Sequence, residues 1–494
     1  MPIKPFPELH VNNTKTALVE GNRCVSYEEL NSRINCLASG LLGQRRDLEE
    51  ECIAFLLPAS VDYVTVIHGV WRAGGIAVPL NVASAVSELD HYLSCAGVSR
   101  MLVGDGKQKS LSDLCKALNI ELLTVGDVIS DSAGPLPEIE EDRRAMMLFT
   151  SGTTNKPKGV VSTHKTIVAQ ITTLIDAWEW IDGDVIPLFL PLHHIHGIIN
   201  ILSCGLWAGA TVHLYPRFDI KEITQAVTAG TFTVFMAVPT IYVKLIEYFD
   251  SADETEVRQI CEGFKSMRLN ISGSAACPVN LFMQWQDLTS QVLLERYGMT
   301  EIGMGISNPY SGERRAGCVG QPLPGVEVKL FDERDNPVIS ESIAGEIRIK
   351  GQNVFLEYWN NTEATTKSFR DGWFCTGDVA MVEDGYYRIM GRSSVDIIKS
   401  GGYKLSALEI EGVLLTHDDI AEVAVIGVED EVWGEAVTAF ICLRQGASLN
   451  YEELKSWCSG RMSPYKIPKT IRIVNSLPRN AMGKVTKPDL RKLL

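Results

Sequence analysis

The sequence predicts an α/β fold with a large N-terminal region, in which helices cover two parallel sheets, followed by a small α+β C-terminal unit. Three observations lead to this prediction. Short apolar runs alternate with helical stretches through the first 330 residues, short strands with turn signals replace them from about residue 326, and the pattern changes again after Arg392. A chain of 494 residues is long enough for about three such units.

The N-terminal region alternates between strand and helix patterns. Apolar runs at 53–57 and 77–78 have the length of buried strands, and the stretch 61–73 between them has apolar residues at helical spacing. The same pattern recurs further along, with strands expected at 232–238, 269–272 and 292–294 and a helix at 241–249. Because strands and helices follow one another along the chain, we expect parallel strands whose faces are covered by helices.

Two smaller units follow. The segments VEVKLFDERDNPV, GEIRIKG and DGYYRIMGR predict short, mostly antiparallel strands joined by turns. After residue 392, strands are expected at 397–398, 421–427, 436–443 and 471–474, with helices at 407–415 and 451–459. We therefore predict an N-terminal domain over residues 1–392, which includes a small β subdomain at about 326–392, and a C-terminal domain over residues 393–494.

Composition limits the classes of partner. The net charge of −15 argues against nucleic acid or an acidic membrane surface as a partner. Twelve cysteines occur without a C-x-x-C pair, which predicts free thiols in a reducing compartment. The N-terminus MPIKPFPELH has neither signal-peptide nor clear transit-peptide character, and the longest apolar segment, 198–212, is too short and too polar to span a membrane. We expect a cytoplasmic protein, or a mitochondrial matrix protein if a transit segment has been removed; the oligomeric state is not predicted.

The loop TSGTTNKPKG at 150–159 is the strongest single motif. It combines glycines with the hydroxyl and lysine side chains of Thr150, Ser151, Thr153, Thr154, Lys156 and Lys158. Freed backbone N–H groups, short hydroxyls and an ammonium suit the oxygens of a polyphosphate. A kinase-type phosphate loop would need a hydroxyl residue after its lysine, whereas Gly159 follows Lys158. A solvated polar hairpin loop is the alternative.

This loop resembles the S-G-T-T-G-x-P-K-G signature of the adenylate-forming enzymes, which include acyl-CoA synthetases, luciferases and peptide-synthetase adenylation domains. Asn155 replaces the usual glycine, and asparagine tolerates a left-handed backbone better than most residues. Further motifs recur in family order, so the resemblance covers nearly the whole chain. It implies binding of ATP, Mg²⁺ and coenzyme A, and a C-terminal domain that acts as a mobile lid.

The resemblance assigns roles to motifs beyond the loop. In ERYGMTE it places Tyr297 near adenine, Thr300 at the α-phosphate and Glu301 at magnesium, and a carboxylate beside a triphosphate does need an intervening cation. SGSAAC would let a purine approach the backbone closely. TGD at 376–378 and GR at 391–392 are expected on turns of the β subdomain, where Asp378 would accept two hydrogen bonds from the ribose hydroxyls and Arg392 would make a second ribose contact. The candidate ATP-binding residues are Thr150, Ser151, Gly152, Thr153, Thr154, Lys156, Lys158, Gly273, Ser274, Ala275, Tyr297, Gly298, Asp378 and Arg392.

The C-terminal motifs resemble the catalytic parts of a lid. Lys484 in PRNAMGKVTK matches the family's mobile catalytic lysine, which would bridge the substrate carboxylate and the α-phosphate as charge builds. In IKSGGYKLSALEIEG, Lys399, Gly401 and Gly402 would lie along the pantetheine arm of coenzyme A. Ser394 takes the hinge position, where the family usually has Asp or Lys.

Polar residues in the expected acyl pocket indicate the substrate. His194 of HHIHG matches a usual position at the pocket entrance, and His196 falls where an aromatic or apolar residue is common. Arg296 precedes Tyr-Gly, where relatives carry a small or neutral residue. An unpaired buried cation costs several kcal/mol, and a second substrate carboxylate would pair with it. The alternative for Arg296 is a salt bridge within the protein, and the alternative for the H-x-H pair is a metal site. Arg268 is a weaker second candidate for carboxylate binding.

The segments LPLHHIHG, FMAVPTIYVKLIEYF, ERYGMTE and IIKSGGYKLSALEIE resemble the malonyl-CoA synthetases, especially the animal mitochondrial acyl-CoA synthetase family member 3 type. This resemblance implies a CoA ligase for malonate or methylmalonate, a small dicarboxylic acid. Three alternatives remain open: a CoA ligase for a monocarboxylic fatty or aryl acid, a stand-alone adenylation enzyme that loads a carrier protein, and a non-catalytic nucleotide sensor.

Overall fold

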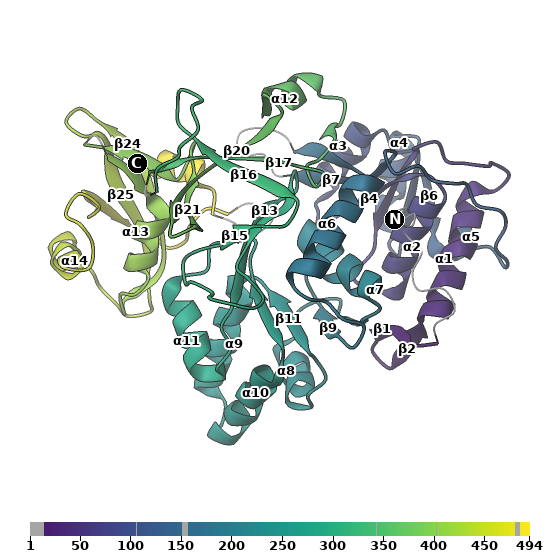
Figure 1. Cartoon of the computed structure of the whole chain (residues 1–494), viewed down its shortest axis with the longest axis horizontal. Helices are drawn as coiled ribbons and strands as arrows, with labels where there is room; N and C mark the ends of the chain where they lie inside the picture. Colours follow the sequence, from purple (N-terminus) through teal and green to yellow (C-terminus); the bar gives the residue numbers. More distant parts are fainter. Residues whose placement is uncertain (1–13, 105, 151–156, 342, 402, 480–484) are drawn as a thin grey trace.

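The computed structural model describes residues 14–104, 106–150, 157–341, 343–401, 403–479 and 485–494. Its first layer is a seven-stranded sheet in the order β18-β8-β7-β4-β3-β5-β6 (Figure 1). The strands are β3 (Cys52–Leu56), β4 (Ile76–Pro79), β5 (Arg100–Val103), β6 (Glu121–Thr124), β7 (Arg144–Thr150), β8 (Lys158–Thr163) and β18 (Glu357–Tyr358). Strands β3 to β7 are parallel, whereas β8 and β18 are antiparallel edge additions.

Helices cover both faces of this sheet, which explains its continuous apolar strands. Ile53 and Phe55 face one hydrophobic cluster, and Ala54 and Leu56 face another. The first cluster includes α1 (Tyr27–Leu42), α2 (Val61–Arg72) and α6 (His164–Ala177), and the second includes α3 (Val86–Ala96) and α4 (Gln108–Ala117). A strand buried on both faces has no polar side to alternate with. The α/β class that the alternating pattern predicted is confirmed.

The second layer consists of a four-stranded sheet, β2-β1-β10-β9, and a five-stranded sheet, β11-β12-β13-β14-β15. They adjoin where the Thr233 N–H donates to the Val185 carbonyl oxygen, 2.9 Å away. The strands are β1 (Thr16–Glu20), β2 (Arg23–Ser26), β9 (Val185–Leu188), β10 (Thr211–Leu214), β11 (Val234–Ala237), β12 (Leu269–Ser272), β13 (Leu294–Met299), β14 (Gly303–Ser307) and β15 (Gln321–Pro322). The helices are α7 (Cys204–Ala208), α8 (Ile220–Thr228), α9 (Pro239–Ser251), α10 (Glu254–Ser266) and α11 (Val279–Thr289). Edge strands β2, β14 and β15 are antiparallel, so this layer is mixed rather than wholly parallel.

An antiparallel sheet, β16-β17-β20-β19 with β21 on β20, follows. Its strands are β16 (Val326–Phe331), β17 (Gly345–Gly351), β19 (Phe369–Arg370), β20 (Trp373–Glu383) and β21 (Tyr386–Arg392), with α12 (Thr362–Lys367) between β18 and β19. The TGD and GR motifs were expected on turns, and this is wrong. Thr376–Asp378 lie inside β20 and Gly391–Arg392 end β21, because the register shifts near Val379 let both strands continue through them.

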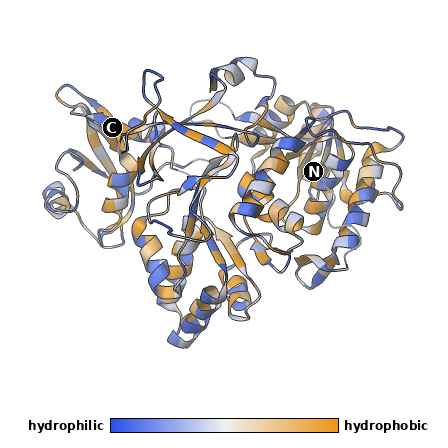
Figure 2. Ribbon diagram, viewed as in Figure 1, coloured by the Kyte–Doolittle hydropathy of each residue, from blue (hydrophilic) through white to orange (hydrophobic). Residues whose placement is uncertain are grey.

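The C-terminal unit has its own sheet, β23-β22-β25-β24 with β26 on β25, which Figure 1 shows beside β20 and β21. Its elements are β22 (Ile397–Ser400), β23 (Tyr403–Ser406), β24 (Ile420–Asp430), β25 (Gly434–Leu443), β26 (Thr470–Ile473), α13 (Ala407–Leu414), α14 (Tyr451–Cys458) and α15 (Lys487–Leu490). Separate apolar clusters cover its two faces. Figure 2 shows hydrophilic and hydrophobic residues alternating around the outer helices of the whole chain.

The apolar segment 198–212 is divided among three short elements. These are a π-helix (His196–Ser203), α7 and β10. Within the described residues, no helix has both the length and the apolar character needed to cross a membrane.

Candidate active site

Two neighbouring parallel strands, β12 and β13, bring the centre of the site together. Ser272 pairs in register with Glu295, so the next residues along each strand, Gly273 and Arg296, also lie side by side. A Cβ added at Gly273 would lie 2.5 Å from Cζ of Arg296. The absence of a side chain at Gly273 therefore leaves room for the Arg296 guanidinium to pack against the backbone.

The side chains of His196, Ser274 and Arg296 meet at this point. The Ser274 hydroxyl lies 3.1 Å from Nδ1 of His196 and accepts a hydrogen bond from Nη2 of Arg296 at 3.4 Å. Ser274 has a left-handed backbone, with φ of 68°, which aims its side chain between the two groups. Ser274 was predicted among the ATP-binding residues; the structure instead connects it to the two acyl-pocket candidates.

Arg296 is a buried cation beside the neutral imidazole of His196, and no anion among the described residues pairs with it. Arg296 is 4% exposed, and among the described residues its Nε has no hydrogen-bond partner and no carboxylate pairs with it; Nε2 of His196 is equally unpartnered. Burial lowers the pKa of Arg296 to about 9. Burial, then the charges of Arg296 and His194, hold the pKa of His196 well below its ordinary value. Because a buried unpaired charge is costly, this cluster favours an anionic ligand.

His194 lies beside the cluster. Its ring and that of His193 have centroids 4.1 Å apart, just before the π-helix that carries His196. Burial, together with the charge of His194, lowers the pKa of His193 to about 3. In the described parts of the chain, no group of three or more His, Cys, Asp or Glu residues is arranged to hold a metal ion.

Arg268 does not belong to this site, and its prediction as a second carboxylate-binding residue is wrong. It precedes the amino end of β12, whereas Gly273 follows the carboxyl end, about 16 Å away along an extended strand. Its Nη2 lies 2.6 Å from Oδ2 of Asp184, and its Nε lies 2.7 Å from Oδ1. Because Asp184 is fully buried, this bidentate pair accounts for the arginine within the fold.

Two of the predicted ATP-binding residues, Tyr297 and Arg392, contact the carboxylate of a third, Asp378. The Tyr297 hydroxyl donates to Oδ2 of Asp378 at 2.6 Å, and Nε of Arg392 donates to Oδ1 at 3.0 Å. Tyr297 lies inside β13, which continues through it to Met299 rather than ending at Leu294 as predicted. The arrangement joins the five-stranded sheet to the β subdomain at the carboxylate expected to hold ribose.

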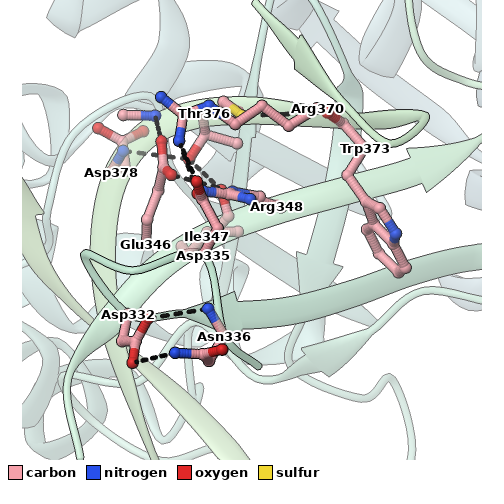
Figure 3. Close-up of polar contacts among 12 residues, drawn as sticks. Asp332, Asp335, Asn336, Glu346, Ile347, Arg348, Arg370, Trp373, Thr376 and Asp378 are labelled. Carbon is pink, nitrogen blue, oxygen red and sulfur yellow. Dashed lines mark hydrogen bonds and ion pairs between the residues drawn. The ribbon is translucent and has the colours of Figure 1, made fainter. Parts of the chain in front are cut away.

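Polar contacts behind Asp378 hold its backbone in place (Figure 3). The Asp378 N–H donates to the Thr376 hydroxyl at 3.1 Å, and that hydroxyl donates to the Ile347 carbonyl at 2.7 Å. Glu346 accepts the Gly377 N–H at 3.2 Å and pairs with Arg348, which in turn pairs with Asp335. These contacts fix the strand on which the Asp378 side chain is mounted.

Glu301 and Lys158 approach each other through a residue that the sequence did not indicate, Tyr358. The Tyr358 hydroxyl donates to Oε1 of Glu301 at 2.9 Å, and the ammonium of Lys158 lies 4.2 Å from the centre of its ring. Glu301 is 5% exposed, and burial is the main cause of its raised pKa. Tyr358 lies on β18, which pairs with β8, and this pairing of distant segments leaves no local sequence signal.

The other candidates of the nucleotide site lie close to these groups in the chain. Thr150 ends β7, Lys158 begins β8, and Ser151, Gly152, Thr153, Thr154 and Lys156 lie outside the described residues. Thr300 is half-buried in the turn after β13, and Ala275 is exposed. A Cβ at Gly298 would clash with the carbonyl oxygen of Gly303, so the close pairing of β13 with β14 requires glycine at this position.

Two of the candidates of the C-terminal unit, Lys399 and Gly401, lie on its first hairpin, which β22 and β23 form. Ser394 is exposed in the turn between β21 and β22. Lys399 donates from Nζ to Glu333 of the β subdomain at 3.2 Å. Gly401 has a φ of 57°, and its N–H donates to the Trp433 carbonyl at 2.9 Å. Gly402 and Lys484 lie outside the described residues.

A buried ion cluster that the sequence did not reveal lies near the Ser394 turn. Nζ of Lys487 lies 2.6 Å from Oδ1 of Asp396 and 2.7 Å from Oε1 of Glu411, and the three side chains are between 11% and 14% exposed. The other Asp396 carboxylate oxygen accepts the Arg392 N–H at 2.9 Å. This cluster therefore ties the last helix of the chain to the turn that joins the two domains.

Comparison with known proteins identifies the family. The AMP-binding enzyme model matches residues 8–359, and the model of the AMP-binding enzyme C-terminal domain matches residues 409–484. The chain is 42% identical to the mitochondrial malonate–CoA ligase ACSF3 of Mus musculus, over 97% of this chain and 88% of that protein. It is 38% identical to a malonate–CoA ligase of Arabidopsis thaliana, over 90% of this chain and 78% of that protein.

Solved structures share this architecture. ATP-bound MatB from Rhodopseudomonas palustris aligns with a TM-score of 0.89 at 32% identity, covering 98% of this chain and 96% of that one. The o-succinylbenzoate CoA synthetase MenE of Bacillus subtilis, in complex with ATP and a magnesium ion, aligns with a TM-score of 0.83 at 28% identity, covering 97% of this chain and 96% of that one. The chain belongs to the AMP-binding enzyme family, as an AMP-forming acyl-CoA synthetase with an N-terminal and a smaller C-terminal domain.

Proposed function

We propose that the protein is an ATP-dependent CoA ligase for malonate or methylmalonate. The observation that carries this proposal is the buried guanidinium of Arg296, which has no anionic partner among the described residues. One carboxylate of a short diacid would pair with Arg296, with Ser274 and Nε2 of His196 as further hydrogen-bonding groups. The other carboxylate would remain available for reaction. The malonate–CoA ligase names of the relatives support the same substrate.

In the first step, a carboxylate oxygen of the diacid attacks the α-phosphorus of ATP, an acyl-adenylate forms and pyrophosphate leaves. Asp378 would bind the ribose hydroxyls, with Tyr297 and Arg392 holding its carboxylate. Lys158 and the hydroxyls of the 150–159 loop would bind the phosphates. Lys484 would stabilise the charge that develops between the carboxylate and the α-phosphate. Thr300 would contact the same phosphate, and His194 would border the acyl group.

The chemistry of Glu301 suits a magnesium ion. It is a buried carboxylate at the turn where the triphosphate is expected, and neither it nor Lys158 forms a salt bridge within the described residues. A hard oxygen ligand combined with substrate phosphates is the usual protein environment of Mg²⁺. When bound, the ion would neutralise phosphate charge as pyrophosphate departs.

In the second step, the thiol of coenzyme A attacks the acyl carbonyl, the thioester forms and AMP leaves. We propose that the C-terminal domain rotates about Ser394 between the two steps. This residue is exposed in the turn between β21, which belongs to the β subdomain, and β22, the first strand of the C-terminal sheet. Gly401, with its left-handed backbone, and its neighbours Lys399 and Gly402 would then line the pantetheine arm.

All twelve cysteines are unpaired in the structure, which supports a reducing compartment. The cytoplasm and the mitochondrial matrix both satisfy this, and several relatives are named as mitochondrial. The partners proposed are therefore a small dicarboxylic acid, ATP and coenzyme A.

The test is ATP-dependent pyrophosphate release with a panel of mono- and dicarboxylic acids, followed by the mass of the product formed with coenzyme A or with a carrier protein. We expect malonate or methylmalonate to give the highest kcat/KM and the product to be the CoA thioester. A higher kcat/KM with propionate, butyrate or benzoate would favour the monocarboxylate alternative, and a product formed only on the carrier would favour the adenylation enzyme.

A further inference from the structure

Tyr358 contacts two groups of opposite charge at the expected nucleotide site. Its hydroxyl donates to Oε1 of Glu301 at 2.9 Å, and the Lys158 ammonium lies over its ring, 4.2 Å from the ring centre. The side chain is 7% exposed and packs against Phe355, with ring centroids 4.9 Å apart. Its position is thus fixed by packing as well as by the two polar contacts.

The surrounding backbone restricts Tyr358 further. It pairs with Val160 across β18 and β8, and its N–H donates to the Thr365 hydroxyl at 3.0 Å. The backbone of Glu301 is held to the same segment, because its carbonyl accepts the Phe355 N–H at 2.7 Å. The tyrosine, the carboxylate and the strand that begins with Lys158 therefore form one connected unit.

A direct ion pair between Lys158 and Glu301 would interfere with both of their roles. The ammonium would then have its charge neutralised before phosphate arrives, and the carboxylate would carry a cation where magnesium is needed. An aromatic ring attracts an ammonium through its electron-rich face without neutralising it, and a phenol donates to a carboxylate without supplying a charge. Tyr358 can therefore hold both groups and keep both charges available.

We propose that Tyr358 is a positioning residue that keeps Lys158 and Glu301 apart and directs them to phosphate and to magnesium. This inference rests on the proposed function, in which those two groups bind Mg-ATP. Tyr358 itself takes no part in bond making or breaking.

Two substitutions separate its two contacts. Tyr358→Phe keeps the ring under Lys158 but removes the hydroxyl that donates to Glu301. We therefore expect the Mg²⁺ concentration that gives half-maximal pyrophosphate release to rise about tenfold, and we expect excess Mg²⁺ to restore the rate. Tyr358→Leu removes the ring as well, and we expect the Kd of Mg-ATP, measured by calorimetry without malonate, to rise about tenfold beyond that of the Phe variant. The KM for malonate should stay within about twofold in both.

Tyr387→Phe is the matched control, because it removes another buried tyrosine hydroxyl, one that donates to the Val328 carbonyl at 3.3 Å. Unchanged Mg²⁺ dependence and Mg-ATP affinity in Tyr358→Phe and Tyr358→Leu would overturn the proposal, as would an equal change in Tyr387→Phe. Glu301→Gln distinguishes the two levels of inference. If it impairs Mg²⁺ dependence while the Tyr358 variants do not, only the positioning role fails; if wild-type enzyme releases no pyrophosphate with any diacid, the proposed function fails.

Discussion

Replacement of Arg296 by methionine should produce a loss of malonate activity together with a gain in stability. Arg296 is 4% exposed, and its Nε finds no partner in the described residues, so in the ligand-free protein it is a desolvated cation without an anion. The methionine side chain is similar in length but carries no charge. Removing the cation would leave the distal carboxylate of malonate buried and unpaired, a cost of about 3–5 kcal/mol. This corresponds to a fall of roughly 150- to 5,000-fold in kcat/KM for malonate.

The assay is pyrophosphate release at saturating ATP, with malonate and propionate compared in wild type and Arg296→Met, alongside thermal unfolding without ligands. Propionate, which has no distal charge, should react with the variant at least as well as with wild type, and the midpoint of unfolding should rise or stay constant. Arg296→Lys should retain part of the malonate activity, because it keeps a charge but loses the planar fork of donors. A variant with unchanged kcat/KM for malonate, or one that loses both acids equally and unfolds at a lower temperature, would refute the reasoning.

Four further predictions concern Lys484, Gly273, the charge of Arg296 and the ion cluster at Lys487. Lys484→Ala should abolish acyl-adenylate formation but leave thioester formation from supplied malonyl-adenylate largely intact, as measured in separate half-reactions; equal loss of both would contradict its role. Gly273→Ala should lower kcat/KM for malonate much more than the affinity for ATP, because the added Cβ would displace the Arg296 guanidinium. The pKa of Arg296 in the free enzyme is about 9, so its charge is present below that pH and lost above it, and kcat/KM for malonate, but not for propionate, should fall as pH rises beyond 9. Lys487→Met should cost about 3–5 kcal/mol in the free energy of unfolding, measured by urea titration, because it leaves two buried carboxylates unpaired; a change under 1 kcal/mol would count against the ion cluster.

Elements with strong local patterns could be predicted closely from the sequence. The stretch predicted as a helix at 61–73 forms α2 (Val61–Arg72), and the run at 269–272 is β12 (Leu269–Ser272). In both, the apolar residues that carry the pattern are buried in the core. The motifs were harder to place within elements: Tyr297 lies inside β13, beyond the strand predicted at 292–294, and Asp378 lies inside β20 rather than on a turn. Hydrogen bonding to neighbouring strands keeps these segments extended, and a single sequence does not record it.

Residue chemistry indicated the acyl cluster only in part. Arg296 and His196 stood out because polar groups are unusual in an apolar pocket, and the structure brings them together through Ser274. Arg268 has the same chemistry but lies at the opposite end of β12, paired with Asp184. Tyr358 and Lys487 gave no signal, because their partners are separated from them by 57 and 76 or more residues in sequence and are brought close only by sheet pairing and by the packing of the last helix.

The central claim is that a second, charged carboxylate of the substrate is bound at Arg296. The most direct measurement compares malonate with its monomethyl ester, which keeps the reacting carboxylate and the approximate shape but lacks the distal charge, in pyrophosphate release by the wild-type enzyme and by Arg296→Met. We predict that kcat/KM for the ester is lower than kcat/KM for malonate by at least about 100-fold in the wild-type enzyme. In Arg296→Met the difference should be less than about threefold, because the variant cannot form the ion pair with either compound. Similar kcat/KM values for the two compounds in the wild-type enzyme would contradict the account.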